Sequence, residues 1–467
     1  MSLSSKLSDT SRHLVTPDNP ASNTGTLDYR RCALLHNFIV EYSWLADGRS
    51  LSDIDRRSFF ERGGDEANKI RERLDLALIS FLEEANDIEY DLEHPNFYFW
   101  VGSIHHPSQM FVISDNFHDD SETITLYPTD VAFCSHLNGL MYHQKQCKAT
   151  MALGIEDRDF TEPIEDHPEL WHPLETVLSN WIHMIQIGKI TASPKETDID
   201  KQGAWEWHSY SEAQVDSTVA AFDQLVDAIE SRMAAESLRP AREGPFLSDE
   251  DLDAASILNP CFVREFLTRV RVPRFEFIAP GLLVSHGREA FVSGQVFTTV
   301  DTSSDDGVVV PPVLLFRATD RTANFDYDSE YISLNPFAGP YGVPKGDHSV
   351  PAGLYSESVR RSEWDNAEEG FRLILPFALS GKEDGARTSD GRRPMKGAVA
   401  DLFQHGFKPF GGEWYRAQRL ERLFEKWTEL VERGVWDIDV KGVAGTVEKF
   451  GDADKGAWRD YYIEPTW

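Results

Sequence analysis

The sequence predicts an α+β protein in which helices and strands occupy separate blocks of the chain. Helical spacing of apolar residues dominates 27–91, and runs of aromatic and β-branched residues that are typical of strands follow it. No regular alternation of strand and helix occurs, which disfavours a doubly wound sheet. We therefore expect a helical and β-meander N-terminal half and a mixed β/α C-terminal half that ends in a long amphipathic helix.

The first 26 residues differ from the rest of the chain. They are polar, rich in Ser, Thr, Asn and Pro, and contain no apolar core of the kind found in a secretory signal. Residues 1–26 are therefore predicted to be a disordered arm. No later run approaches the roughly 18 apolar residues that a membrane span needs, so we expect a soluble, cytoplasmic protein without membrane attachment.

The first folded domain is predicted over residues 27–240. Helices are expected in "DYRRCALLHNFIVEYSWLA" and "DEANKIRERLDLALISFLEEAND", and three strands of a meander in "NFYFWVGS", "MFVISD" and "TITLYP". Further helices are expected over Asp130–Met151, in "PLETVLSNWIHMIQI" before Gly188, and in "SYSEAQVDSTVAAFDQLVDAIESRM". Ser209 and Glu212 have the spacing of a capping box for the last of these helices.

A polar segment with two prolines and a glycine, Glu236–Asp251, is the predicted linker to a second domain over 252–467. That domain opens with a short helix near Asn259–Val270. Strands are then expected in "RFEFIA", "GLLVS", "EAFVSGQVFTTV", "VVVPPVLLFRA" and "FRLILPFAL", with a Gly/Pro loop in "GPYGVPKGDHSVPAG". The closing amphipathic helix is predicted over Trp414–Arg433.

Charge and cysteine usage restrict the function. The chain has 78 acidic and 46 basic residues, a net charge of −32, which disfavours a broad nucleic-acid-binding surface; DNA is not expected as a partner, and a tRNA partner would need local basic patches. Its cysteines, which form no Cys-x-x-Cys pair, are predicted to be reduced thiols rather than zinc ligands: Cys32, Cys134, Cys147 and Cys261. Because nucleotide-binding and zinc-protease motifs are also missing, no metal and no cofactor are expected.

The segment "FCSHLNG" provides the candidate catalytic group. Cys134 or Ser135 could act as nucleophile and His136 as base, although adjacent helical residues do not face one another. On the predicted helix, His136, His143 and Cys147 lie on one stripe, which favours a packing face over a shared metal site.

A second polar group lies in the turn of "MFVISDNFHDDSETITLYP". His118, Asp119 and Asp120 have acid–base and metal-ligand chemistry, but Asp and Asn also satisfy the backbone of tight turns. We interpret this turn as structural. The Glu-x-x-His motif ending at His172 is followed by Pro173, which breaks the helix that a di-iron site requires.

Basic residues gather in three places despite the acidic total. They occur in "VREFLTRVRVPR", in "RTSDGRRPMK" and along the last helix. Most are expected to form ion pairs with neighbouring acids. The Gly-flanked loop in the middle cluster best suits a phosphate backbone, and its candidate binding residues are Arg387, Arg392, Arg393 and Lys396.

Three passages in the second half carry a resemblance to a known family. They are "SVRRSEWDNAEEGFRLILPFALSG", "LFQHGFKPFGGEWYRAQRLERLFEKW" and "WRDYYIEPTW". They resemble fungal proteins encoded in secondary-metabolite gene clusters, and the chain is similar to the arginine-containing cyclodipeptide synthases among them. The resemblance implies an aminoacyltransferase that joins an arginyl and a second aminoacyl group, both from aminoacyl-tRNA, into a diketopiperazine. It assigns no catalytic residue.

Two other hypotheses stay open. The chain could be a biosynthetic cyclase or isomerase that acts on a preformed small molecule without tRNA, or a non-catalytic interaction protein. Dependence of the activity on tRNA separates the first alternative from the synthase. A deep polar pocket in the structure would argue against the second.

Overall fold

The computed structural model describes residues 3–88, 97–117, 122–129, 139–153, 164–194, 204–298, 303–304, 307–326, 329, 334–337, 349–362, 365–412 and 417–466. The chain forms two compact units. The first contains Met1–His208, Lys408–Trp414 and Trp467, and the second contains Ser209–Phe407 and Tyr415–Thr466. Both helices and strands are present, which confirms the predicted α+β class. Among the described segments, no helix combines the length and the apolar character needed to cross a membrane.

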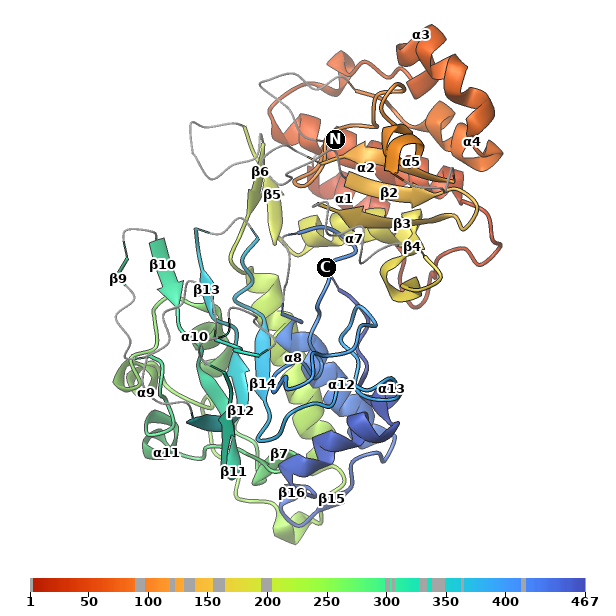
Figure 1. Ribbon diagram of the computed structural model, residues 1–467. Coiled ribbons are helices and arrows are strands. Elements are labelled where there is room, and N and C mark those ends of the chain that lie inside the picture. The colour runs from red at the N-terminus through yellow and green to blue at the C-terminus, as the bar shows by residue number, and fades with distance from the viewer. Residues whose placement is uncertain are drawn as a thin grey trace. The chain divides into compact units, whose positions relative to one another are not determined.

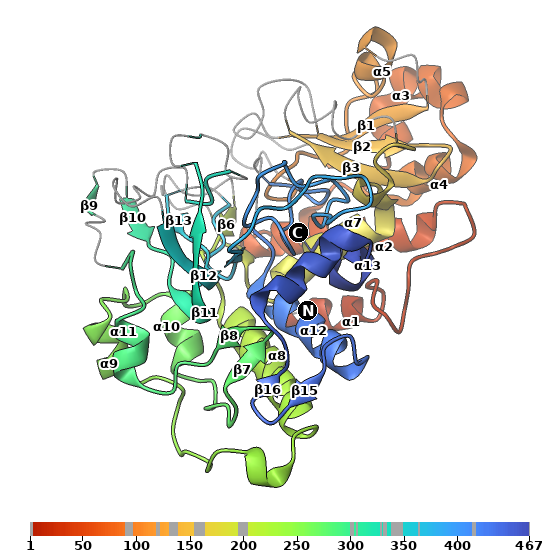
Figure 2. The ribbon, with the colours of Figure 1, turned by 60° about the horizontal axis from the view of Figure 1, so that its bottom comes forward.

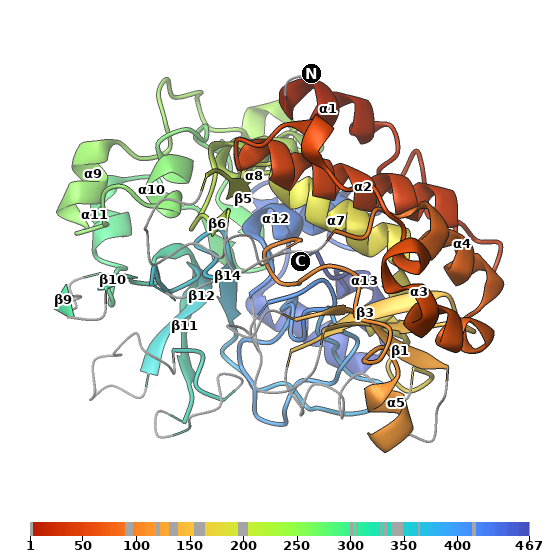
Figure 3. The same ribbon diagram turned by 90° about the horizontal axis from the view of Figure 1, so that it is seen from above.

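The first unit places helices around a small antiparallel sheet (Figures 1 and 3). Its helices are α1 (Leu3–Ser11), α2 (Tyr29–Ala46), α3 (Phe59–Ile70), α4 (Leu76–Glu84), α5 (Val112–Phe117) and α7 (Leu174–Gln186). Its strands are β1 (Thr123–Pro128), β2 (Gly139–His143), β3 (Lys148–Ala152), β4 (His172–Pro173), β5 (Ile190–Ala192) and β6 (Trp205–Trp207). Helices α2 and α7 lie side by side, as Figure 3 shows.

The meander of the first unit is built from strands that differ from the predicted ones. The observed order is β1-β2-β3-β4, with antiparallel pairing throughout (Figure 2). The prediction of a helix over Asp130–Met151 is therefore wrong for residues 139–151. Gly139 marks the reason, because a Cβ there would lie 1.9 Å from the Tyr127 carbonyl oxygen. The glycine lets β2 approach β1 closely instead of interrupting a helix.

"MFVISD" was predicted as a strand, but it leads into α5. Burial explains the difference. Met110, Phe111, Ile113 and Ser114 are buried, and this spacing is helical rather than alternating. Only "TITLYP" among the three predicted strands becomes one, as β1.

The predicted disordered arm is ordered in the described residues 3–26. Helix α1 is followed by an extended segment that bonds to α7. The Val15 N–H donates to Ser179 Oγ at 2.9 Å, and the Ser22 N–H donates to the Glu175 carboxylate at 3.0 Å. The arm itself is polar, so its order depends on these two acceptors in α7. They lie 164 and 153 residues further along the chain, and the local sequence of the arm therefore does not reveal them.

A later piece of the chain belongs to the first unit. In its described residues, 408–412, the Pro409 carbonyl oxygen accepts from the Met151 N–H at 3.0 Å, and the Phe410 carbonyl oxygen accepts from Trp181 Nε1 at 2.7 Å. The first unit is therefore not one continuous stretch. The predicted boundary segment, Glu236–Asp251, lies inside the second unit.

His36 lies at the centre of the first unit's aromatic core. Its Nε2 is 2.9 Å from the Asn86 carbonyl oxygen and its Nδ1 is 2.8 Å from the Tyr127 hydroxyl, while its ring stacks on Phe97 at 4.6 Å. The carbonyl can only accept, so Nε2 carries the proton and Nδ1 accepts from the tyrosine. Burial lowers the pKa of His36 to about 4.

The second unit has a seven-stranded sheet of order β14-β12-β11-β8-β7-β16-β15 (Figure 1). Its strands, with those of a smaller sheet β13-β10-β9, are β7 (Phe277–Ala279), β8 (Leu282–Leu283), β9 (Ser303–Ser304), β10 (Gly307–Val310), β11 (Leu314–Asn324), β12 (Ser349–Ser356), β13 (Val359–Arg360), β14 (Phe371–Ile374), β15 (Ile438–Asp439) and β16 (Gly442–Val443). Its helices are α8 (Glu212–Glu230), α9 (Asp249–Ala254), α10 (Phe262–Leu267), α11 (Arg288–Val292), α12 (Leu420–Glu432) and α13 (Trp458–Tyr461).

Helices α8 and α12 pack against each other and against the large sheet (Figures 1 and 2). The Phe222 ring of α8 lies 5.3 Å from the Phe424 ring of α12 and 6.1 Å from the Phe316 ring of β11. The predicted apolar stripe of α8 is thus its buried face. Its capping box is formed by Ser211 and Gln214 rather than by Ser209 and Glu212.

Three further predictions in the second unit are corrected. Arg288–Val292 forms α11, whereas a strand was predicted over this part of "EAFVSGQVFTTV". Ser349–Ser356 forms β12, whose first residues were assigned to a Gly/Pro loop. The last amphipathic helix is confirmed as α12, but the chain continues beyond it into β15, β16 and α13. Strand β16 pairs in parallel with β7, which extends the sheet.

The neutral buried His36 should make the protein sensitive to acid. Between pH 6.5 and 4 the unfolded chain protonates this histidine and the folded chain does not, so stability falls as pH falls through that window. The loss at pH 5 is about 2 kcal/mol. Urea unfolding at pH 7.5 and 5 should therefore show a smaller pH effect in His36→Gln than in the wild type.

Asp87 acts in the opposite direction, because burial raises its pKa to about 6. Asp87→Asn should accordingly steepen the loss of stability toward pH 5.

For His36, a pH dependence of stability in His36→Gln that equals that of the wild type would contradict the assignment of a neutral buried imidazole.

Candidate functional site

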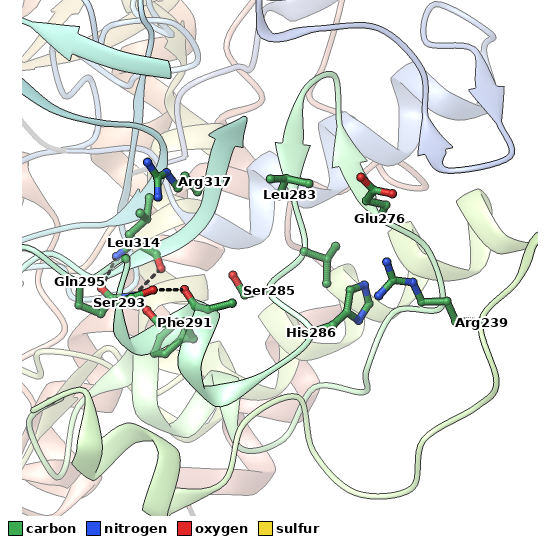
Figure 4. A pocket seen from close by; sticks show the side chains of 13 residues that line it. Arg239, Glu276, Leu283, Ser285, His286, Phe291, Ser293, Gln295, Leu314 and Arg317 are labelled. Carbon is green, nitrogen blue, oxygen red and sulfur yellow. Dashed lines mark hydrogen bonds between the residues drawn. The ribbon is translucent and has the colours of Figure 1, made fainter. Parts of the chain in front are cut away.

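A pocket of about 460 Å³ lies in the second unit beside the β7–β8 hairpin (Figure 4). Residues from the hairpin, from the loop after it, from α11 and from the start of β11 line it. The polar members of this lining are Arg239, Glu276, Ser285, His286, Ser293, Gln295 and Arg317.

The hairpin that forms one wall depends on a tight turn. Phe277 pairs with Leu283, and Leu283 pairs in turn with Arg317 of β11. Gly281 in the turn has a φ of +71°, and a Cβ there would lie 2.5 Å from the Val447 backbone nitrogen. Only glycine fits this conformation and this approach, so the turn fixes where the chain leaves β8 toward His286.

His286 is oriented by a single strong hydrogen bond. Its Nε2 is 2.6 Å from the Phe275 carbonyl oxygen. A carbonyl oxygen cannot donate, so Nε2 carries a proton and the neutral ring keeps its lone pair on Nδ1. The imidazole therefore presents a potential base whose tautomer is fixed by the backbone.

The surroundings keep this imidazole neutral at neutral pH. Burial lowers the pKa of His286, and the Arg239 and Arg242 guanidinium groups lower it further. The hydrogen bond to Phe275 and the Glu276 carboxylate oppose these effects without reversing them. Figure 4 shows Arg239 extending toward His286 and Glu276.

The remaining polar groups have two roles: the Glu276 carboxylate can bind a ligand, and Gln295 stabilises the wall of the pocket. The Glu276 carboxylate is half-buried and lies 3.5 Å from Lys441 Nζ. Gln295 bridges α11 to β11, since its Nε2 donates to the Leu314 carbonyl oxygen at 3.0 Å and its Oε1 accepts from the Leu314 N–H at 2.9 Å. Gln295 is therefore structural, whereas Glu276, Ser285 and His286 remain available for chemistry.

The predicted catalytic residues Cys134, Ser135 and His136 lie outside the described residues, as does the turn His118–Asp120. His143 and Cys147 are described, and they lie on the β2–β3 hairpin rather than on a helix, which removes the predicted helical stripe. His143 Nδ1 accepts from the Gln146 N–H at 3.2 Å, so it stabilises the turn.

The predicted phosphate-binding loop is described, and one of its cations is already engaged. Arg387 donates to carbonyl oxygens of its own loop, including those of Gly385 at 3.2 Å and Ala386 at 3.1 Å, and it lies over the Trp458 ring at 5.4 Å. Arg392, Arg393 and Lys396 are exposed. Arg387 therefore supports the loop, while the other three cations face solvent.

The buried Asp390 carboxylate stabilises the loop from Arg387 to Lys396 through hydrogen bonds. Asp390 accepts from the Phe407 N–H at 2.7 Å, from the Arg392 N–H at 3.2 Å and from the Thr388 hydroxyl. The Tyr462 hydroxyl donates to the neighbouring Ser389 carbonyl oxygen at 2.9 Å. The loop, predicted as flexible, is thus held from inside by Asp390 and from the C-terminal segment by Tyr462.

The other two basic clusters are largely neutralised, as expected. Arg264 lies between the Asp249 and Asp253 carboxylates, at 2.9 and 2.6 Å. On α12, Arg422 pairs with Glu425 at 2.6 Å and Lys426 with Glu429 at 2.5 Å.

Sequence reasoning missed the His286 pocket although a local signal was present. "RFEFIAPGLLVSHGR" contains two predicted strands around Pro-Gly; Ser285 is the last residue of the second predicted strand, and His286 follows it directly. Polar residues that follow strand ends often face a pocket. What the sequence could not supply is the Phe275 carbonyl oxygen that orients the imidazole.

No protein-family model, curated protein or solved structure matches this chain. Within the described residues, no group of three or more His, Cys, Asp or Glu side chains is arranged to hold a metal ion. The site is therefore interpreted from its own geometry.

Replacing Asp390 tests the order of the basic loop. Asp390→Ala removes the acceptor of the buried Phe407 N–H and of the partly buried Arg392 N–H, and should cost about 2–4 kcal/mol of stability. The exposed Asp384 of the same loop provides the control, because Asp384→Ala should change the free energy of unfolding by less than about 0.5 kcal/mol. Equal effects in urea unfolding would show that Asp390 does not hold the loop.

Proposed function

We propose that this chain is a biosynthetic aminoacyltransferase that joins an arginyl and a second aminoacyl group, both carried by tRNA, into a diketopiperazine. The substrate class comes from the resemblance of Ser358–Gly381, Leu402–Trp427 and Trp458–Trp467 to arginine-containing cyclodipeptide synthases. The observation that carries the proposal is the neutral His286 imidazole, whose Nδ1 lone pair can take a proton in a polar pocket.

The reaction fits a site that has a base and needs no nucleotide. An aminoacyl ester is already activated, so positioning and proton transfer are the remaining requirements. The α-amino group of one ester attacks the carbonyl carbon of the other, and the C–N bond forms as the C–O bond to the ribose breaks. His286 accepts the amine proton and returns it to the departing ribose oxygen. The remaining amine then attacks the remaining ester, which closes the ring and releases the second tRNA.

Two further groups have places in this reaction. Glu276 would hold the guanidinium of the arginyl substrate, since a carboxylate can bind guanidinium through two hydrogen bonds. The exposed cations Arg392, Arg393 and Lys396 would meet the phosphate backbone of tRNA.

A second candidate function is favoured by the size of the pocket. A volume of about 460 Å³ is in the range of small-molecule sites. The same base could serve a tRNA-independent cyclase or isomerase that acts on a preformed small molecule. Sensitivity of product formation to ribonuclease separates the two candidates.

Feeding labelled arginine to bacteria that express the chain tests the proposal. The expected result is a labelled diketopiperazine in the medium, detected by mass spectrometry, and its loss when a cell-free reaction is treated with ribonuclease. A product that survives ribonuclease would favour the second candidate. Folded protein that yields no arginine-labelled product would reject the aminoacyltransferase.

Replacing the base tests the role of the pocket. His286→Asn keeps a side chain that can donate to the Phe275 carbonyl oxygen but removes the base, so product formation should fall about 100-fold or more. In the wild type, the rate should fall as pH falls through the His286 pKa, which lies below its usual value. His106→Asn, at an exposed histidine of the other unit, is the matched control and should leave the rate unchanged.

Charge reversal in the basic loop tests tRNA binding separately. Arg392→Glu with Arg393→Glu should weaken tRNA binding and flatten its dependence on salt concentration, because fewer counterions are released. Filter binding over a range of salt concentrations measures both effects. Unchanged affinity and salt slope would remove this loop from the tRNA site.

A further inference from the structure

Two arginines in the His286 pocket differ from almost all others in the described part of the chain. Other arginine side chains there form ion pairs, hydrogen bonds or ring contacts, as Arg242 does with the Pro245 and Phe246 carbonyl oxygens. The exceptions are Arg239, Arg317 and Arg393, whose guanidinium groups make no such contact with any described residue. Two of these three line one pocket, in a chain with 78 acidic residues.

The two guanidinium groups belong to opposite ends of the pocket (Figure 4). Arg317 lies on β11, and β8 and β7 follow in the sheet. Beyond β7, the Arg239 N–H bonds to the carbonyl oxygen of Arg274, on the segment that leads into β7. The two arginines are thus anchored on different segments, Arg317 on β11 and Arg239 on the chain beside the approach to β7, so each belongs to its own end of the pocket.

The lining between the two ends is less polar. Leu283 and Ser285 lie between the arginines, and Phe291 lies on the side of Arg317 (Figure 4). Glu276 is the one carboxylate among the lining residues, and Lys441 Nζ lies 3.5 Å from it. The lining thus carries two guanidinium groups against a single carboxylate, which favours a negatively charged ligand.

We propose that this pocket binds an elongated ligand with an acidic group at each end, one on Arg239 and the other on Arg317. Guanidinium groups bind carboxylates and phosphates through paired hydrogen bonds, so either acid can serve. Two sources have this chemistry: an aliphatic diacid, and a short single-stranded oligonucleotide whose backbone phosphates are spaced along the groove. The inference stands on the pocket and holds whether or not the proposed reaction does.

Calorimetric titration of the full-length protein tests the inference with defined probes. The probes are dodecanedioate, the trinucleotide pCpCpA and the short diacid succinate. The expected result is binding of at least one long probe, weakened about tenfold or more in Arg239→Ala and again in Arg317→Ala. Succinate should bind at least about tenfold more weakly than that probe. Arg321→Ala is the matched control and should bind like the wild type, because Arg321 lies on the same strand as Arg317 but outside the pocket lining and pairs with Glu448.

Each outcome supports or overturns the inference. Binding of dodecanedioate alone identifies a small diacid, and binding of pCpCpA alone identifies a phosphate backbone. Succinate binding as tight as that of the long probe, loss in only one arginine variant, or no binding of either long probe at millimolar concentration would each overturn it. Circular dichroism of both variants confirms that lost binding is not lost folding. Since no product is measured, failure here is distinguishable from failure of the proposed function.

Discussion

The packing of Phe222 against both α12 and the large sheet is the contact on which the second unit depends. The centroid of its ring lies 5.6 Å from that of Phe266, 5.3 Å from that of Phe424 and 6.1 Å from that of Phe316. These contacts join three helices, α8, α10 and α12, and the strand β11 into one core. The sheet held in this way carries the β7–β8 hairpin, and the hairpin carries His286 at its exit. The candidate base is therefore attached to a sheet that is anchored by this aromatic packing.

The excess of acidic residues means that most described arginines lie beside carboxylates. Where arginines occur beside acidic helices they are matched, as Arg271 is by Asp223, Asp227 and Glu230. Exposed pairs of this kind contribute little stability, about 0–1 kcal/mol each, but they remove positive charge from the surface. The pocket that Arg239 and Arg317 line, and the exposed Arg392–Lys396 loop, are accordingly the places where a negatively charged ligand can gain most.

Sequence patterns predicted those helices in which one face is buried and the opposite face is exposed. Helices α8 and α12 show their apolar faces in the sequence because exposed residues occupy their opposite faces. Strands β2 and β3 are buried on both faces, so no alternation is visible and the segment was read as a helix. The candidate site was harder to predict, because it depends on single long-range contacts. The Phe275 carbonyl oxygen that orients His286 lies eleven residues away across a hairpin, and no residue pattern marks it.

The most direct test of this account is the protonation state of His286. Nitrogen NMR of the imidazole, assigned by comparison with His286→Asn, reports both the tautomer and the titration midpoint. The account predicts a neutral ring at pH 7 with the proton on Nε2, and a midpoint below the usual value of about 6.5. A protonated ring at pH 7, or a neutral ring with its proton on Nδ1, would contradict the assignment of His286 as the base of the pocket.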